Sequence, residues 1–223
     1  MKKTTISEAL PELWDALGQT ALMVSVAFAL TVVIGGAIGL LLYITSPQGL
    51  WPQRTINAIT GAIVNVGRSL PFLILLIALI PLTRAIVGTA FGPEAAIVPL
   101  TIGSVPFFGR VVESALREVS GGKIEAAQAM GSTGWQIVRK VLLPESVGPL
   151  IAAATLTLVM LIGYSTMAGT IGGGGLGDFA IRYGYQRFNT PVLLTSVVLL
   201  VVLVQAIQSL GDALVRRRAH LYS

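Results

Sequence analysis

The sequence contains no cysteine, and its single histidine, His220, lies near the end of the 223-residue chain. The absence of cysteine excludes disulfides and thiol chemistry, and one histidine argues against most transition-metal sites. Charged residues are also scarce, at 11%, whereas soluble domains have about 25%. Hydrophobic residues make up 54% of the chain, and the mean hydropathy is +0.81. This composition indicates a membrane protein.

The charged residues that are present do not indicate nucleic-acid binding or catalysis. The net charge is +5, but the lysines and arginines cluster in polar segments between apolar runs, where they determine membrane topology. Arg110, Glu113 and Arg117 are spaced to lie on one face of a helix, so we expect them to pair with one another. No pair of carboxylates and no nucleophile with a base is evident. We therefore predict no catalytic residues, no metal site and no nucleic-acid partner.

The N-terminus does not resemble a secretory signal. Its two lysines are followed by three acidic residues, and the apolar run after them is too long for a signal and ends without a cleavage site. We therefore expect the first span to be retained in the membrane.

Three segments without any charged residue predict three membrane spans. Residues 16–53, 146–177 and 188–211 each exceed the roughly 20 residues needed to cross a bilayer. We place span one at about 20–44 and span four in the first two-thirds of 146–177. Span five should begin at Asn189 or Thr190, with Pro191 in its first turn.

The middle of the chain is less regular. Residues 69–83 and 95–109 each provide only fifteen uncharged residues, about 22 Å of helix. Span two reaches full length only through Arg68, and span three only through Arg110 and Glu113. Apolar runs offset the cost of a central arginine, about 3 kcal/mol, so we predict five transmembrane helices. A re-entrant hairpin over 69–109 is the alternative.

A polar segment interrupts the apolar runs between the predicted spans three and four. Residues 125–144 read EAAQAMGSTGWQIVRKVLLP, and we call residues 120–145 the insert. We expect a helix after the break at Gly121 and Gly122, with Glu125 in its first turn at the positive end of the helix dipole. Gly131 permits a sharp bend that a side chain would resist. The insert should therefore be a helix–turn–helix; the alternative is an amphipathic loop on the membrane surface.

The second half of the insert should present an apolar stripe formed by Trp135, Ile137 and Val138. Pro144 should begin the next segment, where its missing N–H does no harm. Alanines keep the first helix slender, and the second helix presents this stripe. Both features suit docking of the insert into a groove on a partner protein.

The distribution of cations orients the chain. Two predicted spans separate the insert from the C-terminus, so the insert and the C-terminus lie on the same side of the membrane. That side contains more lysines and arginines than the other side, where the cations lie mostly beside acidic residues. The positive-inside rule then places the insert and C-terminus in the cytoplasm and the N-terminus outside. The predicted regions are an external N-terminal segment (1–19), a single transmembrane domain (20–215) with the insert at 120–145, and a cytoplasmic tail (216–223).

The insert resembles the coupling-loop motif of the membrane subunits of ATP-binding-cassette importers. The matching positions are Glu125, Ala126, Ala127, Gly131, Val141, Leu143 and Pro144, with Val141 where that family more often has isoleucine. The segments 106–116 (PFFGRVVESAL) and 163–188 and the short length are similar to methionine-importer permeases. The resemblance covers roughly residues 10–218.

The resemblance implies an all-α type I importer subunit in the bacterial cytoplasmic (inner) membrane, with a pair of cytoplasmic coupling helices between spans three and four. It implies a homodimer with an ATP-binding-cassette ATPase, which binds the ATP, and an extracytoplasmic methionine-binding protein. No cofactor is expected in this chain. The implied substrate is methionine (L- or D-); another amino acid or an osmoprotectant is the alternative.

The resemblance also implies two sets of site residues. Coupling to the ATPase is assigned to Glu125, Ala126, Ala127, Gly131, Trp135, Leu143 and Pro144. A pathway that opens alternately to each side should be lined by polar or soft groups on span four, namely Tyr164, Ser165, Thr166 and Met167. Met167 is flexible enough to plug a gate, although methionine is also an ordinary gap filler.

A glycine-rich run, residues 172–177, satisfies the GxGxxG pattern of dinucleotide sites. It follows an apolar helix rather than a strand, which is the wrong context for that site. We interpret the run either as a flexible turn at the end of span four or as a mobile element at the mouth of a pathway.

Overall fold

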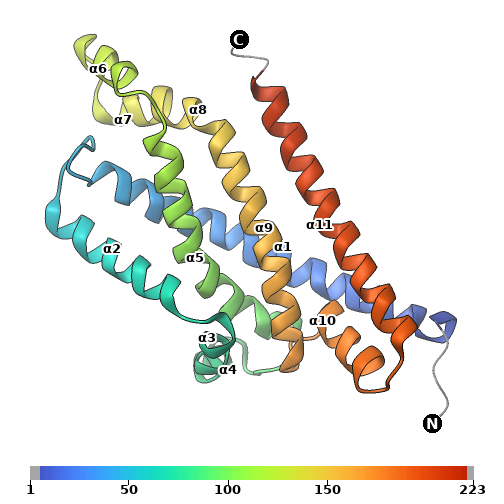
Figure 1. Ribbon diagram of the computed structural model, residues 1–223. Helices are drawn as coiled ribbons and strands as arrows, with labels where there is room; N and C mark the ends of the chain where they lie inside the picture. The colour runs from blue at the N-terminus through green and yellow to red at the C-terminus, as the bar shows by residue number, and fades with distance from the viewer. Residues whose placement is uncertain (1–5, 220–223) are drawn as a thin grey trace. The chain divides into compact units, whose positions relative to one another are not determined.

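A computed structural model describes residues 6–219, with side chains described from 9 to 217. Throughout this range the regular structure is helical, and no strand is present (Figure 1). The elements are α1 (Ile6–Ile44), α2 (Arg54–Ser69), α3 (Phe72–Ala78), α4 (Ile80–Val87), α5 (Pro93–Arg117), α6 (Gly121–Ala129), α7 (Gly134–Ile137), the π-helical turn η1 (Val138–Leu142), α8 (Leu143–Glu145), α9 (Val147–Thr170), α10 (Gly175–Phe179), the π-helical turn η2 (Ala180–Tyr185) and α11 (Thr190–Ala219).

Four helices are long and apolar enough to cross a membrane, and α2 with α3 would make a fifth, broken span. The four are α1, α5, α9 and α11, which confirms the predicted positions of spans one, three, four and five. Helix α5 includes Arg110 and Glu113, as expected for span three. Because α5 is one continuous helix from Pro93, the alternative of a hairpin over 69–109 is wrong in its second half. The chain is an all-α membrane protein.

Span two differs from the straight helix that we expected. Helix α2 stops at Ser69, and a sharp bend precedes α3. Pro71 accounts for the break, because it has no backbone N–H to donate and it disfavours helical geometry at the residue before it. Pro71 itself has φ −59° and ψ 127°, outside the helical region.

Helix α1 extends well beyond the expected span. Its 39 residues correspond to about 58 Å at 1.5 Å per residue, roughly twice the hydrocarbon thickness of a bilayer. The boundary that we predicted at residue 19 therefore falls inside a continuous helix.

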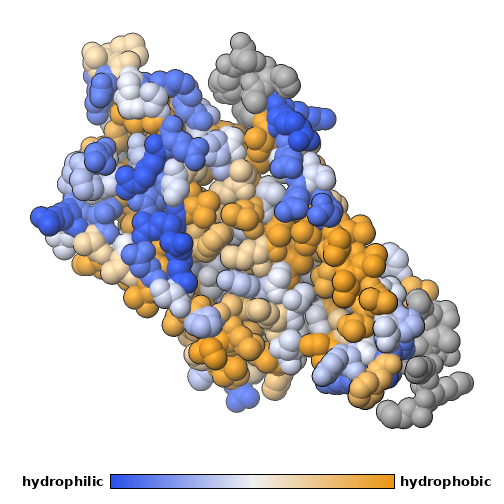
Figure 2. Space-filling view, viewed as in Figure 1, coloured by the Kyte–Doolittle hydropathy of each residue, from blue (hydrophilic) through white to orange (hydrophobic). Residues whose placement is uncertain are grey.

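The chain forms two compact units. The first comprises the chain up to Leu30 together with Leu70–Gly103 and Leu158–Gln208, and the second comprises Thr31–Ser69, Ser104–Thr157 and the chain from Ser209. The core of the first unit packs Met23 and Ala27 of α1 with Leu76 of α3, Leu100 of α5 and residues of α9 such as Leu161. Exposed valines and leucines remain on α11 in this unit (Figure 2), as expected of a surface that faces lipid.

The second unit contains a hydrophobic core and two polar contacts that fix α5. Its core includes Tyr43, Phe108, Leu116 and Leu142. The hydroxyls of Thr31 and Ser104 lie 2.6 Å apart and are fully buried. Such hydrogen bonds between spans contribute about 0.6 kcal/mol each.

The second polar contact is the predicted ion-pair group on α5, which is confirmed. Arg110 Nη1 lies 2.6 Å from Glu113 Oε2, and Arg117 Nη2 lies 2.7 Å from Glu113 Oε1. Arg110 Nη2 also donates to Asn65 Oδ1 of α2 at 2.8 Å. Glu113 is therefore a buried carboxylate with two cationic partners.

Candidate functional site

The first helix of the insert, α6, begins earlier than expected. It starts at Gly121, so the two glycines begin this helix rather than end the previous one. Glu125 consequently lies in the second turn, where the helix dipole has little effect, and our expectation of a first-turn carboxylate is wrong. Glu125 and Ala126 are exposed, whereas Ala127 is buried. The exposed face of α6 is thus slender and has one negative charge.

The turn after α6 depends on a left-handed glycine. Gly131 has φ 80°, and its N–H donates to the carbonyl of Gln128 at 2.9 Å. The next N–H, of Ser132, donates to the carbonyl of Ala127 at 3.0 Å. These two bonds form the Schellman motif that ends many helices. The predicted bend at Gly131 is confirmed, together with the hydrogen bonds that fix it.

The second helix, α7, begins with a reciprocal cap. The hydroxyl of Thr133 accepts from the N–H of Gln136, and the side chain of Gln136 accepts from the N–H of Thr133 at 2.8 Å. Trp135 is 61% exposed, but Ile137 and Val138 are almost fully buried. The apolar stripe that we expected is therefore wrong in two of its three residues, since both pack into the chain.

The insert stays helical up to Pro144 through a π-helical turn. The N–H of Leu143 donates to the carbonyl of Val138, five residues earlier. A widened turn of this kind accommodates the proline that follows, because the proline removes one donor and its ring needs space. Leu143 is partly exposed and Pro144 is half-buried.

An exposed methionine at the tip of the insert was missed in the sequence. Met130 is 80% exposed beside Gly131, and with Trp135 it gives the insert a largely apolar tip. An ion pair between Lys123 Nζ and Glu145 Oε2, at 2.5 Å, joins the two ends of the insert. The sequence did contain a signal for this exposure, because Met130 directly precedes Gly131, the glycine of the turn.

A groove of about 400 Å³ borders α6 within the second unit. Its lining is partly polar and includes Tyr43, Arg117, Glu125 and Gln128.

The four pathway candidates on α9 differ in accessibility. The Tyr164 ring stacks on Phe72, with centroids 3.9 Å apart. Ser165 is buried, and its hydroxyl donates to the carbonyl of Ile162 at 2.7 Å. Thr166 donates to the carbonyl of Gly163 and is half-buried, and Met167 is exposed. Met167 is therefore the most accessible of the four.

The glycine-rich run adjoins α10 in an ordered turn. The N–H groups of Gly175 and Leu176 donate to Gln19 Oε1 and Thr20 Oγ1 of α1, both at 2.8 Å. These side chains satisfy the first donors of α10, as helix caps do. Two side chains of α1 therefore hold this turn, and whether it moves during transport stays a prediction.

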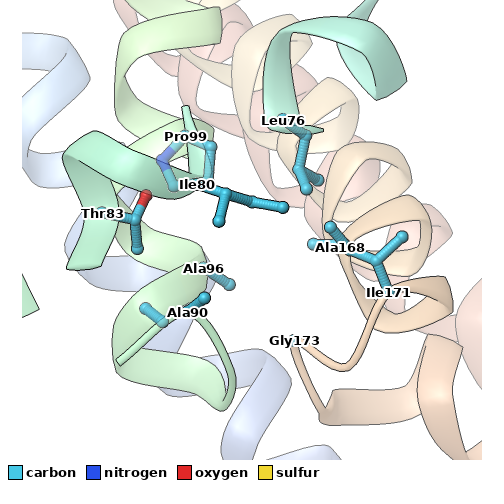
Figure 3. A pocket seen from close by; sticks show the side chains of 10 residues that line it. Leu76, Ile80, Thr83, Ala90, Ala96, Pro99, Ala168, Ile171 and Gly173 are labelled. Carbon is cyan, nitrogen blue, oxygen red and sulfur yellow. The ribbon is translucent and has the colours of Figure 1, made fainter. Parts of the chain in front are cut away.

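A cavity beside this turn is too small for a solute. It measures about 20 Å³ and is enclosed by Leu76, Ile80, Thr83, Ala168 and neighbouring residues (Figure 3). A volume of this size admits about one water molecule. It is not a candidate substrate site.

An all-helical chain with at least four spans and a polar helical insert defines a membrane component of a transport system. Residues 35–220 match the family described as "Binding-protein-dependent transport system inner membrane component", and the chain belongs to this family. Membership confirms that the chain is a multi-pass membrane permease subunit rather than an enzyme.

Relatives with nearly the same length are close in sequence. The chain is 54% identical to the "Probable D-methionine transport system permease protein MetI" of Vibrio cholerae, over 93% of this chain and 92% of that one. It is 46% identical to the "Methionine import system permease protein MetP" of Bacillus subtilis, over 91% of each. A chain in the solved structure "Inward facing conformations of the MetNI methionine ABC transporter: CY5 native crystal form" matches with a TM-score of 0.93 and 48% identity, over 96% of this chain and 99% of that one.

Proposed function

We propose that this chain is the permease subunit of an ATP-driven importer for methionine, in its L- or D-form. The observation that supports this most is full-length similarity at about half identity to proteins named as methionine permeases. Another amino acid or an osmoprotectant is the alternative substrate, because the insert motif is common to permeases of different specificity.

The working assembly that we propose has two copies of this chain. Each copy binds one ATPase subunit, which binds and hydrolyses the ATP, so the permease itself needs no cofactor. An extracytoplasmic binding protein delivers the substrate. The solved relative, described as an ABC transporter, supports an ATPase partner.

The proposed topology follows from the distribution of cations. The insert and the C-terminal tail (216–223) lie in the cytoplasm, and the N-terminal segment (1–19) lies outside. Residues 20–215 form the transmembrane domain. The insert side includes Lys123, Arg139 and Lys140, which the positive-inside rule assigns to the cytoplasm.

The insert is the proposed lever. Its outer surface offers Glu125, Ala126, Trp135 and Leu143 to the ATPase, and the turn at Gly131 sets the angle between its two helices. Buried Ala127 and half-buried Pro144 fix the base of the insert. When ATP closes the ATPase dimer, movement of the insert would switch the side to which the pathway opens.

The proposed pathway runs along α9. Tyr164, Ser165, Thr166 and Met167 are its candidate residues, with Met167 as the gate because its exposed, flexible side chain is able to change rotamer. Buried Ser165 would contribute only after movement of α9.

The test of this function is uptake by vesicles that contain the purified complex. The chain is co-expressed with its neighbouring ATPase and binding protein, and radiolabelled L-methionine, D-methionine, glutamine and glycine betaine are compared. ATP-dependent uptake of methionine alone is expected. Uptake of glutamine or betaine but not methionine would transfer the proposal to the alternative substrate class.

Removal of both Glu125 and Trp135 by alanine should weaken binding of the ATPase. An exposed tryptophan in an interface is typically worth 2 kcal/mol or more, so we expect the Kd to rise roughly 30-fold. Pull-down of the ATPase by the tagged permease measures this. The matched control is Glu12→Ala with Trp14→Ala, which removes an exposed pair of the same chemistry from α1. Equal binding by the two double variants would show that the contact lies elsewhere.

A further inference from the structure

The turn between α1 and α2, residues 45–53, is fixed to the end of α1. The backbone N–H of Trp51 donates to the carbonyl of Ile44 at 2.9 Å, and that of Gln53 donates to the carbonyl of Thr45 at 3.0 Å. The side chain of Asn57 donates to the carbonyl of Leu42 at 2.7 Å. The donors from Trp51 and Asn57 satisfy two of the final carbonyls of α1, which have no partner within the helix. The backbone of Trp51 therefore moves with α1.

The indole of Trp51 packs directly on the insert. A Cβ added to Gly134, the first residue of α7, would lie 2.5 Å from Cζ2 and 2.9 Å from Cε2 of Trp51. Carbon atoms in contact prefer separations of 3.5–4.0 Å. Only glycine allows this approach, so the ring lies against the backbone of the insert. Trp51 remains 43% exposed, so the contact involves one side of the ring.

The part of the insert that Trp51 touches is rigidly held. Thr133 and Gln136 cap the start of α7 reciprocally, and Ile137 at its end and Val138 directly after it are buried. When α7 is displaced, it therefore pushes on the ring of Trp51. The displacement is passed on to the turn at residues 45–53, which contains Trp51. Along the backbone the insert is joined to α5 and α9, and packing joins it to α1 through the core that contains Tyr43 and Leu142 and through Trp51.

We propose that Trp51 is a positioning residue that links the insert to span one. The indole transmits movement of the insert to α1, so that span one moves together with spans three and four during transport. This inference rests on the proposed function, because it assumes that an ATPase moves the insert. Trp51 itself does not contact the ATPase or the substrate in this mechanism.

The test is a double-mutant cycle between Trp51 and Gly134 in the complete complex. Trp51→Ala removes the indole ring. Gly134→Ala adds a methyl group that overlaps with the indole of Trp51. The double variant has the methyl group but not the ring, so the two no longer overlap. The readout is methionine imported per ATP hydrolysed in reconstituted vesicles, with ATPase pull-down measured in parallel. We expect each single variant to lower this ratio about five- to tenfold, with ATPase binding unchanged within about twofold. The double variant should be no worse than Trp51→Ala, because residues in contact are not additive.

Controls separate this role from general damage. Gly121→Ala adds a methyl group to α6, where no atom lies within 4 Å of the new Cβ, and should leave the ratio unchanged. Trp14→Ala removes an exposed tryptophan from another part of α1 and should also be silent. Trp51→Phe keeps an aromatic ring and should restore most of the ratio.

Three results would overturn the inference. One is a normal ratio in Trp51→Ala, and another is a double variant whose loss equals the product of the single losses. The third is loss of ATPase binding in Trp51→Ala, which would make Trp51 a docking residue. A different result would count against the proposed function. That result is normal ATPase binding by the double variant Glu125→Ala with Trp135→Ala.

Discussion

Replacing Gly131 with valine should abolish ATP-driven uptake while leaving the chain inserted in the membrane. Gly131 has φ 80°, a conformation that costs an L-residue about 1–2 kcal/mol and a β-branched residue more. Valine would shift this backbone, and the two hydrogen bonds that end α6 would be lost. The first helix of the insert would then point in another direction, and its exposed residues would miss their partner.

The loss of transport is measured as uptake of labelled methionine. Insertion is measured as the amount of chain in the membrane fraction. Asparagine tolerates the left-handed conformation better than other residues with a side chain, so Gly131→Asn should keep most of the uptake. Normal uptake by Gly131→Val would count strongly against a docking role for the insert.

Replacing Glu113 with alanine should destabilise the fold. Glu113 is 4% exposed and accepts from Arg110 at 2.6 Å and from Arg117 at 2.7 Å. Its removal would leave two guanidinium groups facing each other, and Arg110 Nε already lacks a partner in its buried position. Loss of one partner from a fully buried ion pair costs about 3–5 kcal/mol, and the cost here should be smaller because Arg110 and Arg117 are 28% and 44% exposed, so water partly screens their charges.

Thermal unfolding of the purified chain in detergent measures this cost. Glu118→Ala removes an exposed carboxylate from the residue after α5 and should change the unfolding temperature little. If Glu113→Ala and Glu118→Ala unfold at the same temperature, the ion-pair group has no structural role.

The helices that cross the membrane were predictable because hydropathy determines them directly. The uncharged runs at 16–53, 146–177 and 188–211 correspond to α1, α9 and α11. Span three required Arg110 and Glu113 inside a helix, and their spacing already indicated that they would pair. The bend at Gly131 was also predictable, since few other residues suit that position.

Features that depend on tertiary packing were not predictable from local patterns. The break in span two is an exception, because Pro71 is a local signal for the end of a helix, and the apolar residues on both sides of it led us to expect a continuous span. Ile137 and Val138 looked like an exposed stripe, but both are buried, and Val138 packs in a core with residues such as Tyr43 and Phe108, far away in the chain. The packing of Trp51 on Gly134 joins residues 83 positions apart, a distance beyond any helical periodicity.

The roles of the candidate site residues stay predictions, and the structure reports only which of them are exposed. Glu125, Ala126 and Trp135 are exposed as docking requires, but Met130 was missed because it lies outside the motif. The side chains of Gln19 and Thr20 accept hydrogen bonds from Gly175 and Leu176 of the glycine-rich turn. They were not predictable as its partners, because they come from the opposite end of the sequence.

Cross-linking from the tip of the insert tests the central claim most directly. The chain has no cysteine, so Met130→Cys provides a single thiol for a short thiol-to-amine cross-linker in the assembled complex. We predict a covalent product between the permease and the ATPase. Phe188→Cys, at an equally exposed residue on the proposed outer side, should give none. A product from position 188 but not from position 130 would contradict the proposal that a cytoplasmic ATPase binds the insert.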